Sequence, residues 1–261
     1  MTPFFFGEGE RRLLGVYDPP AHGAGGAPRA AVFCAPWGPD YIVAHGALRR
    51  LAFNLAGGGR HVLRFDYFGA GDSAGEAEEA DLAGWRDDIE MAIEELKGMS
   101  GAPRVSLVGM RLGASLAAEV AAQRMDVDRL ALWDPIVSGR DYLRELEADH
   151  AEWVGERTRY GPLAPTDAPN RVCHPFSRTL EAEIAAVDLA ALAPKLKQKI
   201  LLVVTEPRPG HEALAAALSG GKAGRLSVET VADSAPWRLN RQGFGGPMPS
   251  DALKRITAWM A

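Results

Sequence analysis

Short apolar runs alternate with stretches of helical periodicity along most of the chain. The strand-like runs cover 4–6, 13–17, 30–34, 61–65, 104–108, 129–133, 199–204 and 226–231. Apolar positions at helical spacing fill the intervals between them, at roughly 44–57, 81–98, 111–124, 210–218 and 248–260. This alternation is typical of a mostly parallel central sheet flanked by crossover helices. We therefore expect an α/β domain, opened by a hairpin whose turn contains Gly7-Glu8-Gly9.

One long stretch, residues 138–192, interrupts this rhythm. It carries two helical runs, at 140–153 and 178–191, on either side of the Pro-rich segment 161–169. A span of this length between two core strands far exceeds what a crossover needs. The sequence therefore predicts a core made of residues 1–137 and 193–261, with 138–192 as a helical cap insertion. We expect the cap to lie over the carboxyl edge of the sheet, where open α/β sheets bind their ligands.

A glycine-bounded turn carries the most informative candidate chemistry. The predicted strand 104–108 runs into Gly109-Met110-Arg111-Leu112-Gly113, which opens an alanine-rich helical run. Glycines on both sides of a central residue let a strand reverse sharply into a helix and expose the central side chain at the end of the sheet. A serine nucleophile normally stands there. The guanidinium of Arg111 stays protonated and cannot attack a carbonyl, so the pattern predicts a nucleophile turn without its nucleophile.

The acid and base of a Ser-His-Asp triad are also hard to place. An acid is expected after the strand 199–204, where Glu206 lies in a turn. A base is expected after the last strand, but no histidine follows His211 in the chain. Glu206 is therefore a candidate catalytic acid without an evident base.

Substitute nucleophiles exist but lack a histidine to take their proton. Cys34 ends a predicted core strand and is the main candidate, although buried strand cysteines are usually inert. Ser115 and Ser138 lie near the same edge. Ser73 matches a Gly-x-Ser-x-Gly expression, yet it stands too far from its strand and no helix follows immediately. We assign no catalytic residue firmly, with Cys34 and Glu206 as the candidates.

The order of these motifs resembles the α/β-hydrolase superfamily, in its serine aminopeptidase-like branch. The likeness rests on the loop Ala35-Pro36-Trp37-Gly38, the turn Asp66-Tyr67-Phe68-Gly69-Ala70-Gly71-Asp72-Ser73 and the glycine-bounded turn at 109–113. A narrower resemblance, to α/β-hydrolase-like proteins of the exosortase exopolysaccharide system, rests on 109–114 and on Leu132-Trp133-Asp134-Pro135-Ile136-Val137-Ser138-Gly139. The resemblance implies an α/β-hydrolase fold and a hydrolase-like label without a demonstrated activity.

Composition and charge exclude several other classes. The formal net charge is −5 and no basic run stands out, so we expect no nucleic-acid partner. No window approaches the length of a membrane span, and the amino terminus lacks the pattern of a signal peptide. Cys34 and Cys173 form neither a disulfide framework nor a metal-ligand pattern, so we expect no metal and no cofactor. The cytoplasm is the expected compartment.

The first hypothesis is a pseudoenzyme that binds rather than cleaves. Arg111 would stand at a helix amino terminus, which already favours anions, and so suit an anionic or acyl small molecule. The predicted binding residues are Arg111, Met110, Trp37, Gly38, Trp133 and Asp134. As a structural alternative, Arg111 pairs with Asp134 or Glu206 and only fills the old site.

Two further functions stay open from the sequence. The chain could be an active hydrolase or acyltransferase on ester or thioester substrates, with non-standard catalytic residues. It could also serve polysaccharide or secondary-metabolite biosynthesis as a partner of another pathway protein, through the predicted cap.

Overall fold

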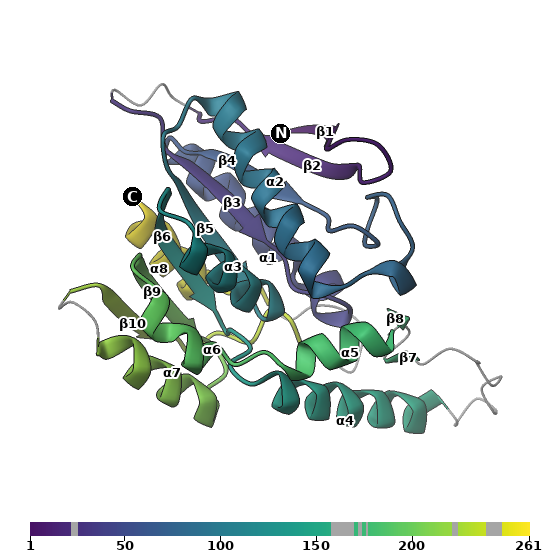
Figure 1. The fold of residues 1–261 in the computed structure, drawn as a ribbon. Helices are drawn as coiled ribbons and strands as arrows, with labels where there is room; N and C mark the ends of the chain where they lie inside the picture. Colours follow the sequence, from purple (N-terminus) through teal and green to yellow (C-terminus); the bar gives the residue numbers. More distant parts are fainter. Residues whose placement is uncertain (22–25, 158–169, 172–173, 176, 221–223, 239–246) are drawn as a thin grey trace.

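The computed structural model describes residues 1–21, 26–157, 170–171, 174–175, 177–220, 224–238 and 247–261 (Figure 1). Its main strands are β1 (Thr2–Phe6), β2 (Leu13–Asp18), β3 (Ala30–Cys34), β4 (His61–Phe65), β5 (Val105–Met110), β6 (Val127–Trp133), β9 (Lys199–Val204) and β10 (Leu226–Thr230). Its helices are α1 (Pro39–Gly57), α2 (Leu82–Ser100), α3 (Leu112–Gln123), α4 (Gly139–Arg157), α5 (Arg178–Ala185), α6 (Leu189–Leu192), α7 (Pro209–Ser219) and α8 (Ser250–Met260). A short pair, β7 (Asn170–Arg171) and β8 (His174–Pro175), lies apart from the main sheet.

The main strands form one eight-stranded sheet in the order β1-β2-β4-β3-β5-β6-β9-β10. The pairs β1/β2 and β2/β4 are antiparallel, and every other neighbouring pair is parallel. Helices α2 and α3 cover one face of the sheet, while α1 and α8 pack together on the other (Figure 1). The predicted α/β class, with a mostly parallel sheet flanked by helices, is confirmed.

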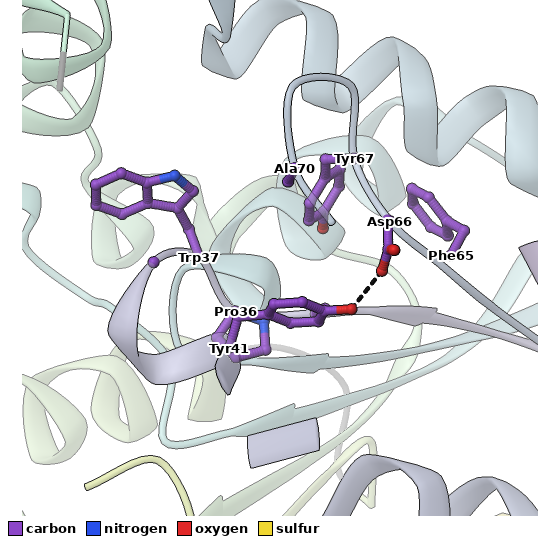
Figure 2. Close-up of a pocket in the computed structure, with 9 residues that line it drawn as sticks. Pro36, Trp37, Tyr41, Phe65, Asp66, Tyr67 and Ala70 are labelled. Carbon is purple, nitrogen blue, oxygen red and sulfur yellow. Dashed lines mark hydrogen bonds between the residues drawn. The ribbon is translucent and has the colours of Figure 1, made fainter. Parts of the chain in front are cut away.

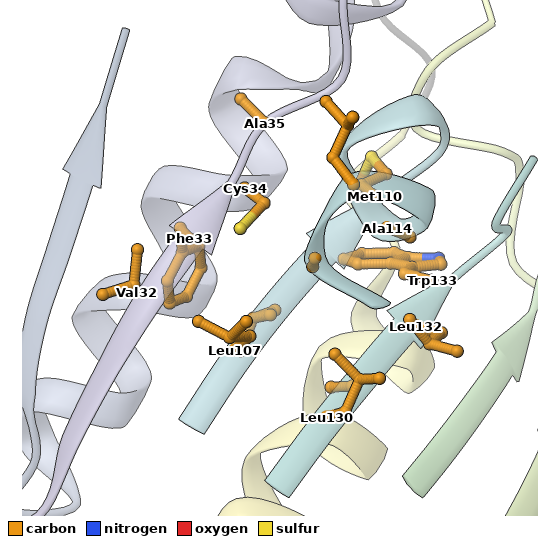
Figure 3. Close-up of a cluster of buried hydrophobic side chains, with 14 of the residues drawn as sticks. Val32, Phe33, Cys34, Ala35, Leu107, Met110, Ala114, Leu130, Leu132 and Trp133 are labelled. Atoms are coloured by element: carbon orange, nitrogen blue, oxygen red, sulfur yellow. The ribbon is translucent and has the colours of Figure 1, made fainter. Parts of the chain in front are cut away.

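The central strands read as continuous apolar runs because helices cover both of their faces. Every residue of β3 and β5 is buried. Figure 3 shows this core around Leu107 and Leu132, with Cys34, Met110 and Trp133 among its members. The carboxyl ends of β3, β5 and β6 therefore rest on a rigid base.

Element boundaries differ from the sequence prediction in two places. Helix α1 begins at Pro39, earlier than predicted, because a proline at the first helical position needs no hydrogen-bonded N–H. The predicted helix 178–191 is wrong as a single element: α5 ends at Ala185, and α6 starts anew because the Asp188 side chain accepts a hydrogen bond from Ala191 N at 3.0 Å. The segment 161–169 and Cys173 lie outside the described residues.

Helices α4, α5 and α6 all come between β6 and β9, within residues 138–192, which we call the insertion. Helices α4 and α5 lie side by side at one end of the molecule, away from the β1/β2 hairpin (Figure 1). Among the described residues, no helix combines the length and apolar character needed to cross a membrane.

Candidate functional site

The turn between β5 and α3 holds Arg111 at its centre in a strained backbone conformation. The φ angle of Arg111 is 53°, in the left-handed region that residues other than glycine rarely adopt. A Cβ atom on Gly113 would lie 2.1 Å from the carbonyl oxygen of Ala35, and one on Gly109 would lie 2.4 Å from the Cα of Ala114. Only glycine therefore fits on either side of Arg111, and β5 turns directly into α3.

The Arg111 side chain is buried at this turn and held on several sides. The residue is 1% exposed. Its guanidinium donates through Nε to Asp40 Oδ2 at 3.0 Å and through Nη2 to Glu145 Oε2 at 2.9 Å. Its central carbon lies 3.7 Å from the centre of the Trp237 ring and 5.2 Å from that of Tyr142, both within cation–π range. Helices α1 and α4 and the chain after β10 together fix this arginine.

Burial and opposite charges together set the pKa values in this cluster. Burial opposes the charge of Arg111, but the carboxylates of Asp40 and Glu145 outweigh burial and raise the pKa of the guanidinium. Burial raises the pKa of Asp40, an effect that Arg111 only partly offsets. Burial acts to raise the pKa of Glu145 too, but hydrogen bonds from Arg208 and the charge of Arg111 prevail and lower it. Glu145 is therefore firmly ionised, and it bridges two arginines.

Asp134, at the end of β6, ties neighbouring loops together and does not pair with Arg111. Its carboxylate accepts hydrogen bonds from Thr205 N at 2.9 Å and Glu206 N at 3.2 Å, and also from the Thr205 hydroxyl. A further bond comes from Trp237 Nε1 at 3.0 Å. Because the Trp237 ring also stacks on the guanidinium, Arg111, Trp237 and Asp134 form one continuous series.

A cavity of about 310 Å³ lies beside Arg111, between the carboxyl ends of the strands and α4. Ile136 and Val137 give it an apolar wall, and Arg111, Arg208 and His211 contribute polar groups. Three buried atoms of these residues, Arg111 Nη1, Arg208 Nε and His211 Nδ1, have no hydrogen-bond partner within the described part of the chain. Unpaired buried polar atoms are rare in folded proteins, and three of them belong to residues that line this one cavity.

Trp37 and Gly38, two of the predicted binding residues, line a separate cavity of only about 20 Å³. Figure 2 shows Trp37 at one side of that cavity and the Tyr41 hydroxyl donating to Asp66 at the other. The Trp37 ring packs 6.3 Å from the ring of Trp85. A space of this size has room for about one water molecule.

The other predicted binding residues divide between the cavity wall and the core. Arg111 lines the 310 Å³ cavity. Met110 and Trp133 have no exposed surface and lie in the core beneath the turn (Figure 3). Asp134 is equally buried and occupied by its loop bonds. The structural alternative from the sequence had Arg111 paired with Asp134 or Glu206, and that pairing is wrong. The carboxylates that pair with Arg111 belong to Asp40 and Glu145.

The catalytic candidates lack the surroundings of reactive groups. Burial raises the pKa of the Cys34 thiol, which has no exposed surface. Glu206 is an ion-pair partner of Arg238 and Arg208 instead of a free carboxylate. Hydrogen bonds from Arg238 are the main cause of its lowered pKa.

The candidate serines have structural hydrogen bonds. Ser73 Oγ donates to Asp66 O at 2.6 Å, and Ser115 Oγ donates to Ile136 O at 2.6 Å. Ser138 accepts from Asp141 N at 3.3 Å, at the start of α4. No group of three or more His, Cys, Asp or Glu residues in the described ranges could hold a metal ion.

Sequence reasoning missed four residues of this site. Asp40, Glu145, Arg208 and Trp237 come from α1, α4, the loop after β9 and the loop after β10. One signal was available: a buried arginine requires a carboxylate partner, and the insertion and the start of α1 both supply acids.

Comparison with known proteins places the chain in a family. Residues 28–183, more than half of the chain, match the family model of the serine aminopeptidases, S33. A comparison with curated proteins returned no match.

Solved structures of similar fold include Est1E from Butyrivibrio proteoclasticus with bound ferulic acid, at TM-score 0.71 and 14% identity over 98% of this chain and 97% of that one. They also include proline iminopeptidase from Mycobacterium smegmatis, at TM-score 0.65 and 13% identity over 99% of this chain and 97% of that one. A third is DcsB in complex with its substrate analogue, at TM-score 0.66 and 15% identity over 99% of this chain and 97% of that one. At such identities these likenesses show the fold. Together with the family match and the sheet order, they establish that the chain belongs to the serine aminopeptidase (S33) family of α/β-hydrolases.

Proposed function

We propose that this protein is a non-hydrolytic member of its family that binds a small anionic or acyl molecule in the cavity beside Arg111. The observation that carries the proposal is the state of Arg111. It stands at the centre of the glycine-bounded turn, where a serine hydrolase keeps its nucleophile, and two carboxylates and an indole hold it in place.

The neighbouring groups argue against hydrolysis as well. A serine hydrolase needs a base that accepts a proton, held in position by an acid. Trp237 follows the last strand, where that base is expected, and its indole nitrogen can only donate. That nitrogen already donates to Asp134. The series Arg111, Trp237 and Asp134 thus has the order of a triad without a nucleophile or a base.

The cavity has the features of a small-molecule site. Its volume of about 310 Å³ is at the lower end of the range for ligand pockets. Arg111 Nη1 and Arg208 Nε are unpaired donors, and Ile136 and Val137 offer an apolar wall for the body of the ligand. An acyl oxygen would accept from these donors once a small movement of the two side chains turned them toward the cavity. A carboxylate would instead take the place of Glu145 between the two arginines.

The test is calorimetric titration with three probes: ferulic acid, because a protein of similar fold binds it, its methyl ester, and octanoate. We expect saturable binding of at least one probe to the wild-type protein. Arg208→Gln removes a charged donor from the wall, a loss of about 1.5–3 kcal/mol, and should weaken binding roughly 10- to 100-fold. Arg144→Gln is the control, since Arg144 lies on α4 with a 76% exposed side chain.

Turnover is measured in parallel. The wild-type protein should not hydrolyse methyl ferulate or p-nitrophenyl acetate above background and should not be labelled by a fluorophosphonate. Absence of saturable binding by every probe would contradict the binding proposal. Equal affinities in wild type and Arg208→Gln would show that the probe binds elsewhere.

An active hydrolase or acyltransferase is the second candidate, favoured by the family match. Cys34 would be its nucleophile and Glu206 its acid. Stoichiometric labelling of Cys34 in the folded protein, together with ester turnover lost in Cys34→Ala, would establish this function and overturn the first.

A further inference from the structure

His211 adds a different kind of group to the cavity that holds Arg111 and Arg208. It lies in the first turn of α7, just after β9, and is 4% exposed. Its Nε2 lies 3.2 Å from the carbonyl oxygen of Pro135. A carbonyl oxygen can only accept a hydrogen bond, so Nε2 carries the ring proton.

The second ring nitrogen is then an acceptor as long as the imidazole is neutral. Burial is the main cause that lowers the pKa of His211, and the charges of Arg208 and Arg111 add to it. Asp134 and the carbonyl of Pro135 oppose these effects without overcoming them. Near neutral pH, Nδ1 therefore presents a lone pair.

This lone pair has no partner among the described residues, although its atom is buried. Two other residues that line the same cavity carry unpaired buried donors, Arg111 Nη1 and Arg208 Nε. Unpaired donors seek an acceptor oxygen, whereas an unpaired acceptor seeks an O–H or N–H hydrogen. One ligand can satisfy all three atoms only if it has both kinds of group.

We propose that His211 Nδ1 accepts a hydrogen bond from a hydroxyl of the ligand, so that the cavity selects hydroxyacyl compounds: acids or esters that also carry a hydroxyl group. This inference rests on the proposed binding function and narrows its ligand class. His211 acts as a specificity residue, because it discriminates hydroxylated ligands from their deoxy analogues and does not hold the acyl oxygen. Sites built to bond a hydroxyl discriminate strongly against analogues that lack one.

The first experiment needs no ligand. In the protein labelled with ¹⁵N-histidine, long-range proton–nitrogen spectra at pH 7 should show His211 with Nε2 protonated and Nδ1 unprotonated. A protonated Nδ1, in either the other tautomer or the charged ring, would overturn the inference.

The second experiment compares matched probes by titration calorimetry: 3-phenylpropionate, 3-phenyllactate and 3-(4-hydroxyphenyl)propionate. The two hydroxylated probes place the hydroxyl near to or far from the carboxylate. We expect the wild-type protein to prefer one of them over 3-phenylpropionate by at least about 5-fold.

Two variants test the role of the ring nitrogen. His211→Leu removes the acceptor, so the preference should vanish while 3-phenylpropionate keeps its affinity within about 2-fold. His211→Asn keeps an acceptor oxygen near the place of Nδ1 and should retain part of the preference. Far-ultraviolet circular dichroism checks that both variants fold, and loss of folding in His211→Leu leaves the wild-type preference and His211→Asn to decide.

The outcomes separate this inference from the function on which it rests. Equal affinities for all three probes in the wild-type protein would overturn the hydroxyl selection and leave the binding function standing. Failure of every probe to bind would overturn both. A preference that persists in a folded His211→Leu would assign the selection to another residue and overturn the role of His211.

Discussion

Replacement of Arg111 by methionine should destabilise the protein strongly, because Arg111 neutralises buried carboxylates. Methionine keeps an unbranched side chain and leaves the backbone strain at this position unchanged, since both residues carry a Cβ. Asp40 would lose its bond to the guanidinium Nε and keep the Tyr142 hydroxyl at 3.3 Å. Glu145 would keep Arg208. The damage therefore concentrates on Asp40.

The magnitude follows from this arrangement. Removing one partner of a buried ion pair costs about 3–5 kcal/mol. Loss of the cation stacked on Trp237 costs about 2 kcal/mol where the pair is desolvated, and contact between the methionine sulfur and the indole returns a part of it. These contributions are not additive, so we expect a total loss of about 3–5 kcal/mol in the free energy of unfolding at pH 7.

The loss of stability in Arg111→Met should depend on pH, and the pKa of Asp40 sets the direction of that dependence. Burial already raises the pKa of Asp40, and removal of Arg111 removes the charge and the hydrogen bond that oppose this rise. In the variant, Asp40 therefore binds a proton more tightly in the folded than in the unfolded state. Stability from such a group is fully present below the unfolded pKa and is lost as pH rises through the folded pKa. The deficit of Arg111→Met should thus shrink between pH 7 and pH 5.

Urea unfolding followed by tryptophan fluorescence at pH 7 and pH 5 measures both effects. Asp40→Asn combined with Arg111→Met removes the titrating group and should flatten the pH dependence. Arg86→Met is the matched control: its ion pair with Glu119 is partly exposed, so the loss should stay below about 1 kcal/mol. A loss below about 1 kcal/mol for Arg111→Met at pH 7, or a deficit that grows on acidification, would refute the reasoning.

Three further results are expected. Arg111→Ser alone should stay inactive toward p-nitrophenyl acetate. Arg111→Ser combined with Trp237→His places a histidine beside Asp134, and its hydrolysis rate should exceed that of either single variant by at least about 10²-fold, the usual contribution of a general base. Equal hydrolysis rates would contradict the triad-like order. Cys34 should resist a disulfide reagent at pH 8 until the protein unfolds, because burial raises its pKa; rapid reaction of the native protein would contradict this. Asp134→Asn should lower Tm by roughly 4–8 °C in calorimetry, since an amide cannot accept all of the bonds that the carboxylate accepts; an unchanged Tm would show that these bonds contribute nothing.

The fold could be read from the sequence because its signals are local. The strands 30–34, 61–65 and 199–204 have the predicted bounds, since each is an apolar run cut off by a change in residue type. The glycines of the turn at 109–113 are required by backbone contacts below 3 Å, which the motif encodes directly. A helix split such as the one at Asp188 escaped prediction because a single capping side chain decides it.

The site was harder to predict from the sequence because the residues that pair with Arg111 lie far from it in the chain. Asp40 and Arg111 are separated by 71 positions, and Arg111 and Glu145 by 34. Nothing near Asp40 distinguishes it from an ordinary acid in the first turn of a helix, where acids are common. Trp237 follows a strand with a short apolar run, and nothing in the sequence around it predicts that its ring will contact the guanidinium of Arg111. Pairing of this kind is set by the fold as a whole.

If the proposed non-hydrolytic function holds, the contacts of Arg111 explain why a serine at this position should not give hydrolysis by itself. A serine at the centre of the turn would leave Asp40 buried beside it without a counter-charge, and an ionised carboxylate next to a reacting carbonyl opposes the negative charge that develops there. It would also face Trp237, which cannot take its proton. The arginine, its carboxylates and the indole therefore depend on one another. Hydrolysis therefore requires changes at the turn and in the loop after β10 together, and neutralising Asp40 at the start of α1 should increase the rate of that double variant further.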